Sequence, residues 1–293
     1  MTSSNDFLQR FLLERAGVRG VLVRLDHAWQ DIRSRGDYPP APARLLGEAL
    51  AASALLTGNI KFSGRLSVQI RSKGPLRLLF TECTDQGHVR GIVRWNSETD
   101  APMTPGEDAL LAITIEQDDR DLRQQGLVTV GGGDLASAFE RYFEQSEQLA
   151  SRIVLAEHAG RCAGIMLQPV ASGGGFGVGD ADGWNRCGHL LATLTAPELA
   201  TLPPDQLLTR LFHDEGVRVF GPRPLAFACT CSRLRVDATL KSLGETECME
   251  AIDADGYVDI TCEFCNQHYR LDRVDIAGLF AVSPPVEGPP TAQ

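Results

Sequence analysis

The feature that most constrains this chain is a set of four thiols near its C-terminal end. They form a CxC motif, CTCS at 229–232, and a CxxC motif, CEFC at 262–265, with 30 residues between the two. Two short pairs of this kind leave three possibilities: the thiols hold a metal, they form disulfides, or they do each in turn. If they hold one metal, the chain must fold so that the two pairs meet.

Zinc is the metal that this spacing favours. It prefers a tetrahedral cage of thiolates, and a CxxC motif lets two sulfurs from one tight turn approach the same ion. Asn266, directly after the second motif, tolerates the left-handed backbone that such a turn adopts. We therefore expect one Zn²⁺ per chain, bound by Cys229, Cys231, Cys262 and Cys265. The alternatives are an iron–sulfur cluster, although the spacing fits neither common ferredoxin pattern, and simple packing of the cysteines.

Two residues near the motifs could compete for the metal. Cys248 lies between them and could add a ligand or form an off-pathway disulfide, but the pattern favours a small buried side chain on a short helix. His268 follows Cys265 by three positions and could replace a sulfur. Because four cysteines already complete the cage, we interpret His268 as a strand side chain.

The second motif is expected on a β-hairpin that spans ADGYVDITCEFCNQHYRL, residues 254–271. We expect Asp255-Gly256 to form its turn and a knuckle to present Cys262 and Cys265. A short helix, DRVDIAGLF, follows.

The metal would stabilise this small segment strongly. Its apolar core is small, so metal binding contributes on the order of 10 kcal/mol or more to folding. An oxidant that converts the thiolates to sulfenates and then to disulfides would release the zinc and unfold the segment. A CxC disulfide is more strained than a CxxC disulfide, so Cys262 and Cys265 are expected to oxidise first.

Charge and composition exclude several classes of protein. The chain has 293 residues, 43% of them hydrophobic, and its net charge of -10 disfavours nucleic-acid binding. Acidic residues also outnumber basic ones, nine to four, between 227 and 272. The first 17 residues lack the apolar run of a secretory signal, and no stretch is apolar enough to span a membrane. We expect a cytoplasmic protein.

The rest of the chain has the pattern of an α+β protein with three ordered parts. We predict an α+β core domain at 1–175, a glycine hinge and helical linker at 176–226, a zinc-binding domain at 227–282 and a disordered tail at 283–293. In the core we expect a buried helix at 42–58 that begins at Pro42, and a helix capped by Asp134. The expected strands are a pair within 64–83, single strands at 88–95 and 109–117, and a final pair at 151–158 and 161–170.

A helical linker is predicted after the glycine-rich stretch at 171–180. Residues 182–216 carry apolar side chains at helical spacings, interrupted by Pro203-Pro204. These side chains are Trp184, Leu190, Leu191, Leu194, Leu207, Leu208, Leu211 and Phe212.

Enzyme interpretations find little support. Cys187 and His189 would point to different faces of one helix, and Cys83 and Cys162 lie in apolar runs typical of packing residues. The glycine-rich stretches lack a phosphate-binding motif. We therefore expect no catalytic residues.

On these features the chain resembles the 33 kDa chaperonin family of redox-regulated heat-shock holdases. The likeness rests on the CxC and CxxC motifs and on four longer segments: VRGVLVRLDHAWQ, LLGEALAASALLTGNIKFSGRLSVQIRSKGPLRLLF, LTAPELATLPPDQLLTRLFHDEGVRVF and CTCSR. It extends over nearly the whole chain.

The resemblance implies an ATP-independent cytosolic chaperone that is zinc-bound and inactive when reduced, is activated by oxidation, binds unfolding client proteins and works as a homodimer. It implies that the four cysteines bind zinc and form the disulfides Cys229–Cys231 and Cys262–Cys265 on oxidation. We expect the freed linker to bind clients through Trp184, Leu190, Leu191, Leu207, Leu211 and Phe212. The alternative is a zinc-stabilised scaffold or regulatory binding protein without redox switching.

Overall fold

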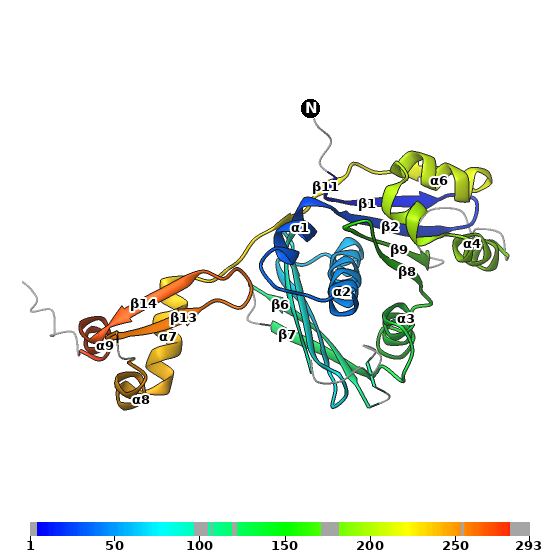
Figure 1. Ribbon diagram of the computed structural model, residues 1–293. Coiled ribbons are helices and arrows are strands. Elements are labelled where there is room, and N and C mark those ends of the chain that lie inside the picture. The colour runs from blue at the N-terminus through cyan, green and yellow to red at the C-terminus, as the bar shows by residue number, and fades with distance from the viewer. Residues whose placement is uncertain are drawn as a thin grey trace, which may run out of the picture. The chain divides into compact units, whose positions relative to one another are not determined.

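The computed structural model describes residues 5–96, 105–106, 108–118, 122–170, 182–252 and 255–281. The chain divides into two compact units, Met1–Ala228 and Cys229–Gln293 (Figure 1). Each unit has a hydrophobic core of its own. Helices and strands mix in both units, which confirms the predicted α+β class. The predicted tail at 283–293 and the hinge at 171–180 lie outside the described residues.

The first unit contains two six-stranded sheets. In the first sheet the strand order is β10-β1-β2-β9-β8, and β11 also pairs with β1. The predicted strand pair at 151–158 and 161–170 is confirmed as β8 and β9, and β9 joins the sheet beside β2. The bounds are β1 Phe7–Leu13, β2 Val18–Leu25, β8 Arg152–His158, β9 Arg161–Pro169, β10 Val217–Val219 and β11 Arg223–Pro224.

The second sheet has the order β12-β5-β4-β3-β6-β7. It contains the predicted pair at 64–83 and the strands at 88–95 and 109–117, all of which are confirmed. The strand β7 was not predicted. The bounds are β3 Gly64–Arg71, β4 Leu76–Thr84, β5 His88–Trp95, β6 Leu110–Gln117, β7 Leu122–Thr129 and β12 Ala226–Phe227.

A long buried helix, α2 (Pro40–Asn59), packs against strands of both sheets (Figure 1). It begins at Pro40 and not at the predicted Pro42, because both prolines fit a first turn whose N–H groups need no partner inside the helix. Its buried hydroxyls donate within the helix: Ser53 donates to the Leu50 carbonyl at 2.9 Å and Thr57 to the Ala54 carbonyl at 2.8 Å. Helix α1 (His27–Arg33) precedes it.

Helix α3 (Leu135–Ser146) begins where the sequence predicted. The Asp134 carboxylate accepts a hydrogen bond of 2.8 Å from the Ser137 N–H, as expected of an N-cap residue.

The helical segment after residue 181 packs on the first sheet and belongs to the same compact unit. It forms α4 (Gly183–Ala192), α5 (Ala196–Thr201), α6 (Pro204–Phe212) and the 3₁₀ helix η1 (His213–Glu215). Its apolar side chains meet alternate residues of β1, β2 and β9, on the face opposite the one that α2 covers. The helices are therefore not a separate body in this structure, because their apolar faces are buried against a sheet.

The second unit is small. It consists of α7 (Arg233–Leu243), α8 (Glu245–Glu250), the strand pair β13 (Tyr257–Thr261) and β14 (His268–Asp272), and α9 (Arg273–Phe280). The hairpin is confirmed, but its predicted turn is wrong: Asp255-Gly256 precedes β13, and the cysteine knuckle itself connects the two strands. The predicted short helix is α9.

Among the described residues, no helix is both long enough and apolar enough to cross a membrane.

Candidate metal centre

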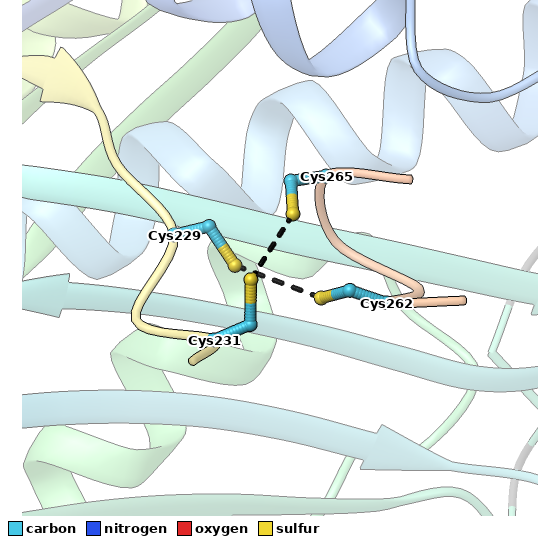
Figure 2. A group of neighbouring side chains, drawn as sticks. All are labelled: Cys229, Cys231, Cys262 and Cys265. Atoms are coloured by element: carbon cyan, nitrogen blue, oxygen red, sulfur yellow. Dashed lines mark hydrogen bonds between the residues drawn. The ribbon is translucent and has the colours of Figure 1, made fainter. Parts of the chain in front are cut away.

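The CxC motif lies in the irregular segment between β12 and α7, where the chain bends between Cys229 and Cys231 (Figure 2). The sulfurs of both residues belong to one group whose members lie within 4.8 Å of one another. The polar residues of CTCS hold the segment: the Ser232 hydroxyl caps α7 by accepting from the Arg235 N–H, and the Thr230 hydroxyl accepts from the Arg235 guanidinium at 2.7 Å. The start of α7 therefore fixes the direction in which the two thiols point.

The CxxC motif forms the tight connection between β13 and β14. The Cys262 N–H donates to the Gln267 carbonyl at 2.9 Å, and the Asn266 N–H donates to the Cys262 carbonyl at 2.8 Å. Asn266 has a φ of 58°, so the left-handed residue expected after this motif is confirmed. This turn directs Cys262 and Cys265 toward the other pair.

The four sulfurs converge on one point (Figure 2). The Cys229 and Cys262 sulfurs lie 3.7 Å apart, and those of Cys231 and Cys265 lie 3.3 Å apart. All four lie within 4.8 Å of one another. A zinc ion with Zn–S bonds of about 2.3 Å sets its sulfurs about 3.8 Å apart, so the thiols fit a tetrahedral metal ion. The two short contacts shown in Figure 2 each join one motif to the other.

Burial and the neighbouring thiols oppose the ionisation of Cys265 when no cation is bound. Burial, together with hydrogen bonds to the other three cysteines, raises the pKa of Cys265 to about 12. A divalent cation reverses this effect because it stabilises several thiolates at once. The donor set therefore suits a cation with a high affinity for sulfur.

Tyr269 is a neighbour of the centre that the sequence did not reveal. Its hydroxyl donates to the Cys231 sulfur at 3.2 Å, and this hydrogen bond raises the pKa of Tyr269 to about 12. Hydrogen bonds of this kind orient a metal ligand and adjust its basicity. The only signal in the sequence is an aromatic residue four positions after Cys265, which is also typical of a strand.

The two possible competitors lie outside the thiol group. Cys248 is buried in α8, where its thiol donates to the Leu240 carbonyl at 3.4 Å, so the predicted packing role is confirmed. His268 lies on β14 and its Nδ1 contacts Asp259 at 3.1 Å, which confirms a strand side chain. Among the described residues, the group that could hold a metal consists of the four cysteines alone.

The six residues proposed for client binding gather in one place in the first unit. Leu191, Leu207, Leu211 and Phe212 are buried in the cluster on the first sheet, and Trp184 and Leu190 pack half-buried against it. The Phe212 ring stacks on Phe11 of β1, with 6.3 Å between ring centres. Any binding surface made of these side chains is therefore covered in this conformation.

The remaining cysteines of the first unit are buried, and His189 of the helical segment is exposed. Cys83 and Cys162 are buried in β4 and β9, as predicted for packing residues. Cys187 is buried in α4, and His189 lies exposed on the same helix.

Residues 6–272 match the family model described as Hsp33 protein. The chain belongs to the Hsp33 family. Two similar relatives, both named 33 kDa chaperonin, come from Nitrosococcus oceani (40% identity, 95% of each chain covered) and Hahella chejuensis (42% identity, 94% of this chain and 97% of the relative). The family match and these relatives extend over nearly the whole chain, and the four cysteines lie within the residues that the family model matches.

The fold agrees with the family. The crystal structure of the 33 kDa chaperonin (heat shock protein 33 homolog) from Thermotoga maritima superposes with a TM-score of 0.79, covers 94% of this chain and 97% of its own, and has 20% sequence identity. The Hsp33 architecture, a mixed α+β unit followed by a small cysteine-bearing unit, is thereby confirmed.

Proposed function

We propose that this protein is a redox-regulated, ATP-independent chaperone that holds unfolding proteins under oxidative stress. The observation that carries the proposal is the convergence of four thiols from two segments on one point. Support also comes from the relatives, which are named 33 kDa chaperonin. In this proposal the reduced protein holds one Zn²⁺ and is inactive, and oxidation activates it.

Cys229, Cys231, Cys262 and Cys265 would hold the zinc. The short sulfur contacts support a tetrahedral four-thiolate site, and the hydroxyl of Tyr269 would orient the Cys231 sulfur. The bound ion would cross-link the start of α7 to the β13–β14 knuckle.

Loss of the metal would destabilise the second unit because little else holds it together. Among its described residues, the buried hydrophobic core consists of Leu240, Cys248, Val258, Leu271 and Ile276. A core of this size rarely stabilises a domain alone, so the metal contributes much of the folding free energy. Oxidation to the proposed disulfides Cys229–Cys231 and Cys262–Cys265 would remove all four ligands.

Unfolding of the second unit would then loosen the helical segment of the first. The chain runs from η1 through the short strands β10, β11 and β12 to Cys229, and β12 has only two residues. A short strand next to an unfolded segment frays easily. Release of α4 and α6 would expose the apolar side chains from Trp184 to Phe212 to a client.

We also propose the partners of the protein and the compartment in which it works. Its partners would be unfolding proteins and, when active, a second copy of the chain; nucleic acids and membranes are not among them. The excess of acidic residues around the cysteines supports the exclusion of nucleic acids. We place the protein in the cytoplasm, where thiols stay reduced until oxidative stress, and assign it no catalytic activity.

An aggregation assay tests this function. Light scattering from a thermally unfolding client is followed with reduced, zinc-loaded protein and with protein treated with peroxide at mild heat, while a chromogenic chelator measures released zinc. We expect suppression of aggregation only after oxidation, in step with zinc release. Equal activity in both states, or zinc loss without activity, would instead favour the scaffold without redox switching.

A further inference from the structure

A cavity of about 620 Å³ lies in the first unit, at the C-terminal end of α2. Arg10 and Leu12 of β1 and Arg19 of β2 line it, together with the chain from Gly58 to Lys61. Its volume is in the range typical of sites for small organic molecules. Apart from Phe220, which lies between β10 and β11, the lining residues are remote in sequence from the cysteines. None of them is a proposed metal ligand or client-binding residue.

The charge that lines this cavity is strongly unbalanced. Arg10, Arg19 and Lys61 contribute three positive charges, and the described lining residues include no carboxylate. Other arginines of the same unit are paired, as Arg90 is with Glu82. The C-terminus of α2 offers only about half a negative charge. Within the described residues, most of this positive charge is therefore not balanced by the cavity lining, in a chain whose net charge is -10.

The Arg19 side chain is held in place by a hydrogen bond to a buried glutamine. Its Nη2 donates to the Gln168 Oε1 at 3.0 Å, and the Asn59 Nδ2 donates to the same oxygen at 2.9 Å. Gln168 is fully buried and donates in turn to the Ser151 hydroxyl at 2.9 Å. The Arg19 Nε is buried and, within the described part of the chain, lacks an acceptor. A phosphate group accepts several such hydrogen bonds at once.

The rest of the lining includes apolar residues. Leu12, Ile60, Val170 and Phe220 line the cavity, and Phe220 keeps 42% of its surface exposed. The Phe220 N–H donates to the Arg10 carbonyl at 2.9 Å, which holds the ring beside β1. An exposed aromatic ring in the same cavity as three cations suits a ligand that joins an anionic group to a flat organic ring.

We propose that this cavity binds a small phosphorylated molecule, with its phosphate on Arg10, Arg19 and Lys61 and its planar ring against Phe220. The proposal concerns a second site and does not depend on the redox function. A nucleoside monophosphate has the required chemistry and serves as the probe, and pyrophosphate reports on the anionic half alone.

Calorimetric titration of the full-length reduced protein at low salt tests the site. We expect AMP and pyrophosphate both to bind. Lys61→Gln should weaken both affinities by about tenfold, because a charge-assisted contact is lost. Lys73→Gln is the matched control, since it makes the same change of charge at an exposed turn outside the cavity, and it should leave both affinities unchanged.

A second variant distinguishes the contribution of the ligand's ring to binding from that of its phosphate. Phe220→Ala should weaken AMP several-fold and leave pyrophosphate unchanged, because only AMP carries a ring. The absence of heat with both ligands at millimolar concentration, or equal weakening by Lys61→Gln and Lys73→Gln, would overturn the site. An AMP affinity that Phe220→Ala leaves unchanged would overturn the role of the aromatic ring.

Discussion

Polar residues next to the thiols hold the local backbone in place, through a helix cap, a side-chain hydrogen bond and a left-handed turn residue. Ser232 and Thr230 bind Arg235 at the start of α7, and Asn266 adopts the left-handed backbone that closes the knuckle. Tyr269 donates directly to a sulfur. These contacts fix the direction in which the four thiols point toward the place where a metal ion would bind.

Substitution of one thiol tests the ligand set at this scale. Cys265→Ser removes one of the four sulfurs and should lower zinc affinity by at least about 100-fold, because an alcohol is a poor ligand for zinc. Cys248→Ser is the control: that thiol is buried in α8, outside the group, so the variant should retain its zinc. Metal analysis after dialysis against a weak chelator gives the result. Full zinc content in Cys265→Ser would contradict the assignment.

The four thiols could be found from the sequence because their spacing is itself the signal. Asn266 and the cap at Asp134 could be found for the same reason, since a left-handed turn and a helix start have local signatures. Tyr269 could not, because its contact with Cys231 depends on how the hairpin and the CxC segment meet in space. Contacts of that kind have no fixed sequence spacing.

At the scale of elements, α2 carries an acidic group in an unfavourable position. Burial is the main cause that raises the pKa of Glu48 to about 7; Asp134 and Glu157 add to the shift, and Arg44, 3.8 Å away, opposes it. The folded chain therefore keeps a proton on Glu48 that the unfolded chain loses near its ordinary pKa of 4.5. Stability from this group is complete below that pKa and is lost as the pH rises toward 7.

Replacement of Glu48 should remove its contribution to the pH dependence of the free energy of unfolding. At about pH 8, Glu48→Gln should unfold with a free energy about 1 to 3 kcal/mol higher than the parent, and the difference should vanish near pH 4. Glu144→Gln, at an exposed position of α3, is the matched control. Urea unfolding followed by tryptophan fluorescence reports on the first unit alone, because all three tryptophans lie there. A less stable Glu48→Gln at pH 8 would refute this account.

The strands β1, β2 and β7 were not predicted from the sequence, and for β7 the reason is the lack of a hydrophobic period. Strand β7 is an edge strand with mostly exposed side chains, so it lacks the alternation that marked β3 and β6. The turn of the β13–β14 hairpin was misplaced because Asp255-Gly256 has the composition of a tight turn, whereas the true connection is the CxxC knuckle. The residue types at Asp255-Gly256 indicated a turn, but the pairing of β13 with β14 shows that the CxxC knuckle joins the two strands.

At the scale of the whole molecule, stability is distributed unequally between the two units. The first unit buries two large apolar clusters around its sheets, whereas the described core of the second consists of five side chains. A unit that depends on a metal for its folding opens when the metal leaves, and a unit with a large core does not. Because of this difference in core size, oxidation would unfold the second unit while the first unit keeps its sheets folded.

Hydrogen exchange measured by mass spectrometry tests this central claim most directly. Reduced, zinc-loaded protein is compared with protein oxidised by peroxide. The account predicts loss of protection in the second unit and in α4 through α6, while β3 to β6 of the second sheet stay protected as an internal control. Equal protection of α4 through α6 in both states would contradict it, because the apolar surface would then remain covered after oxidation.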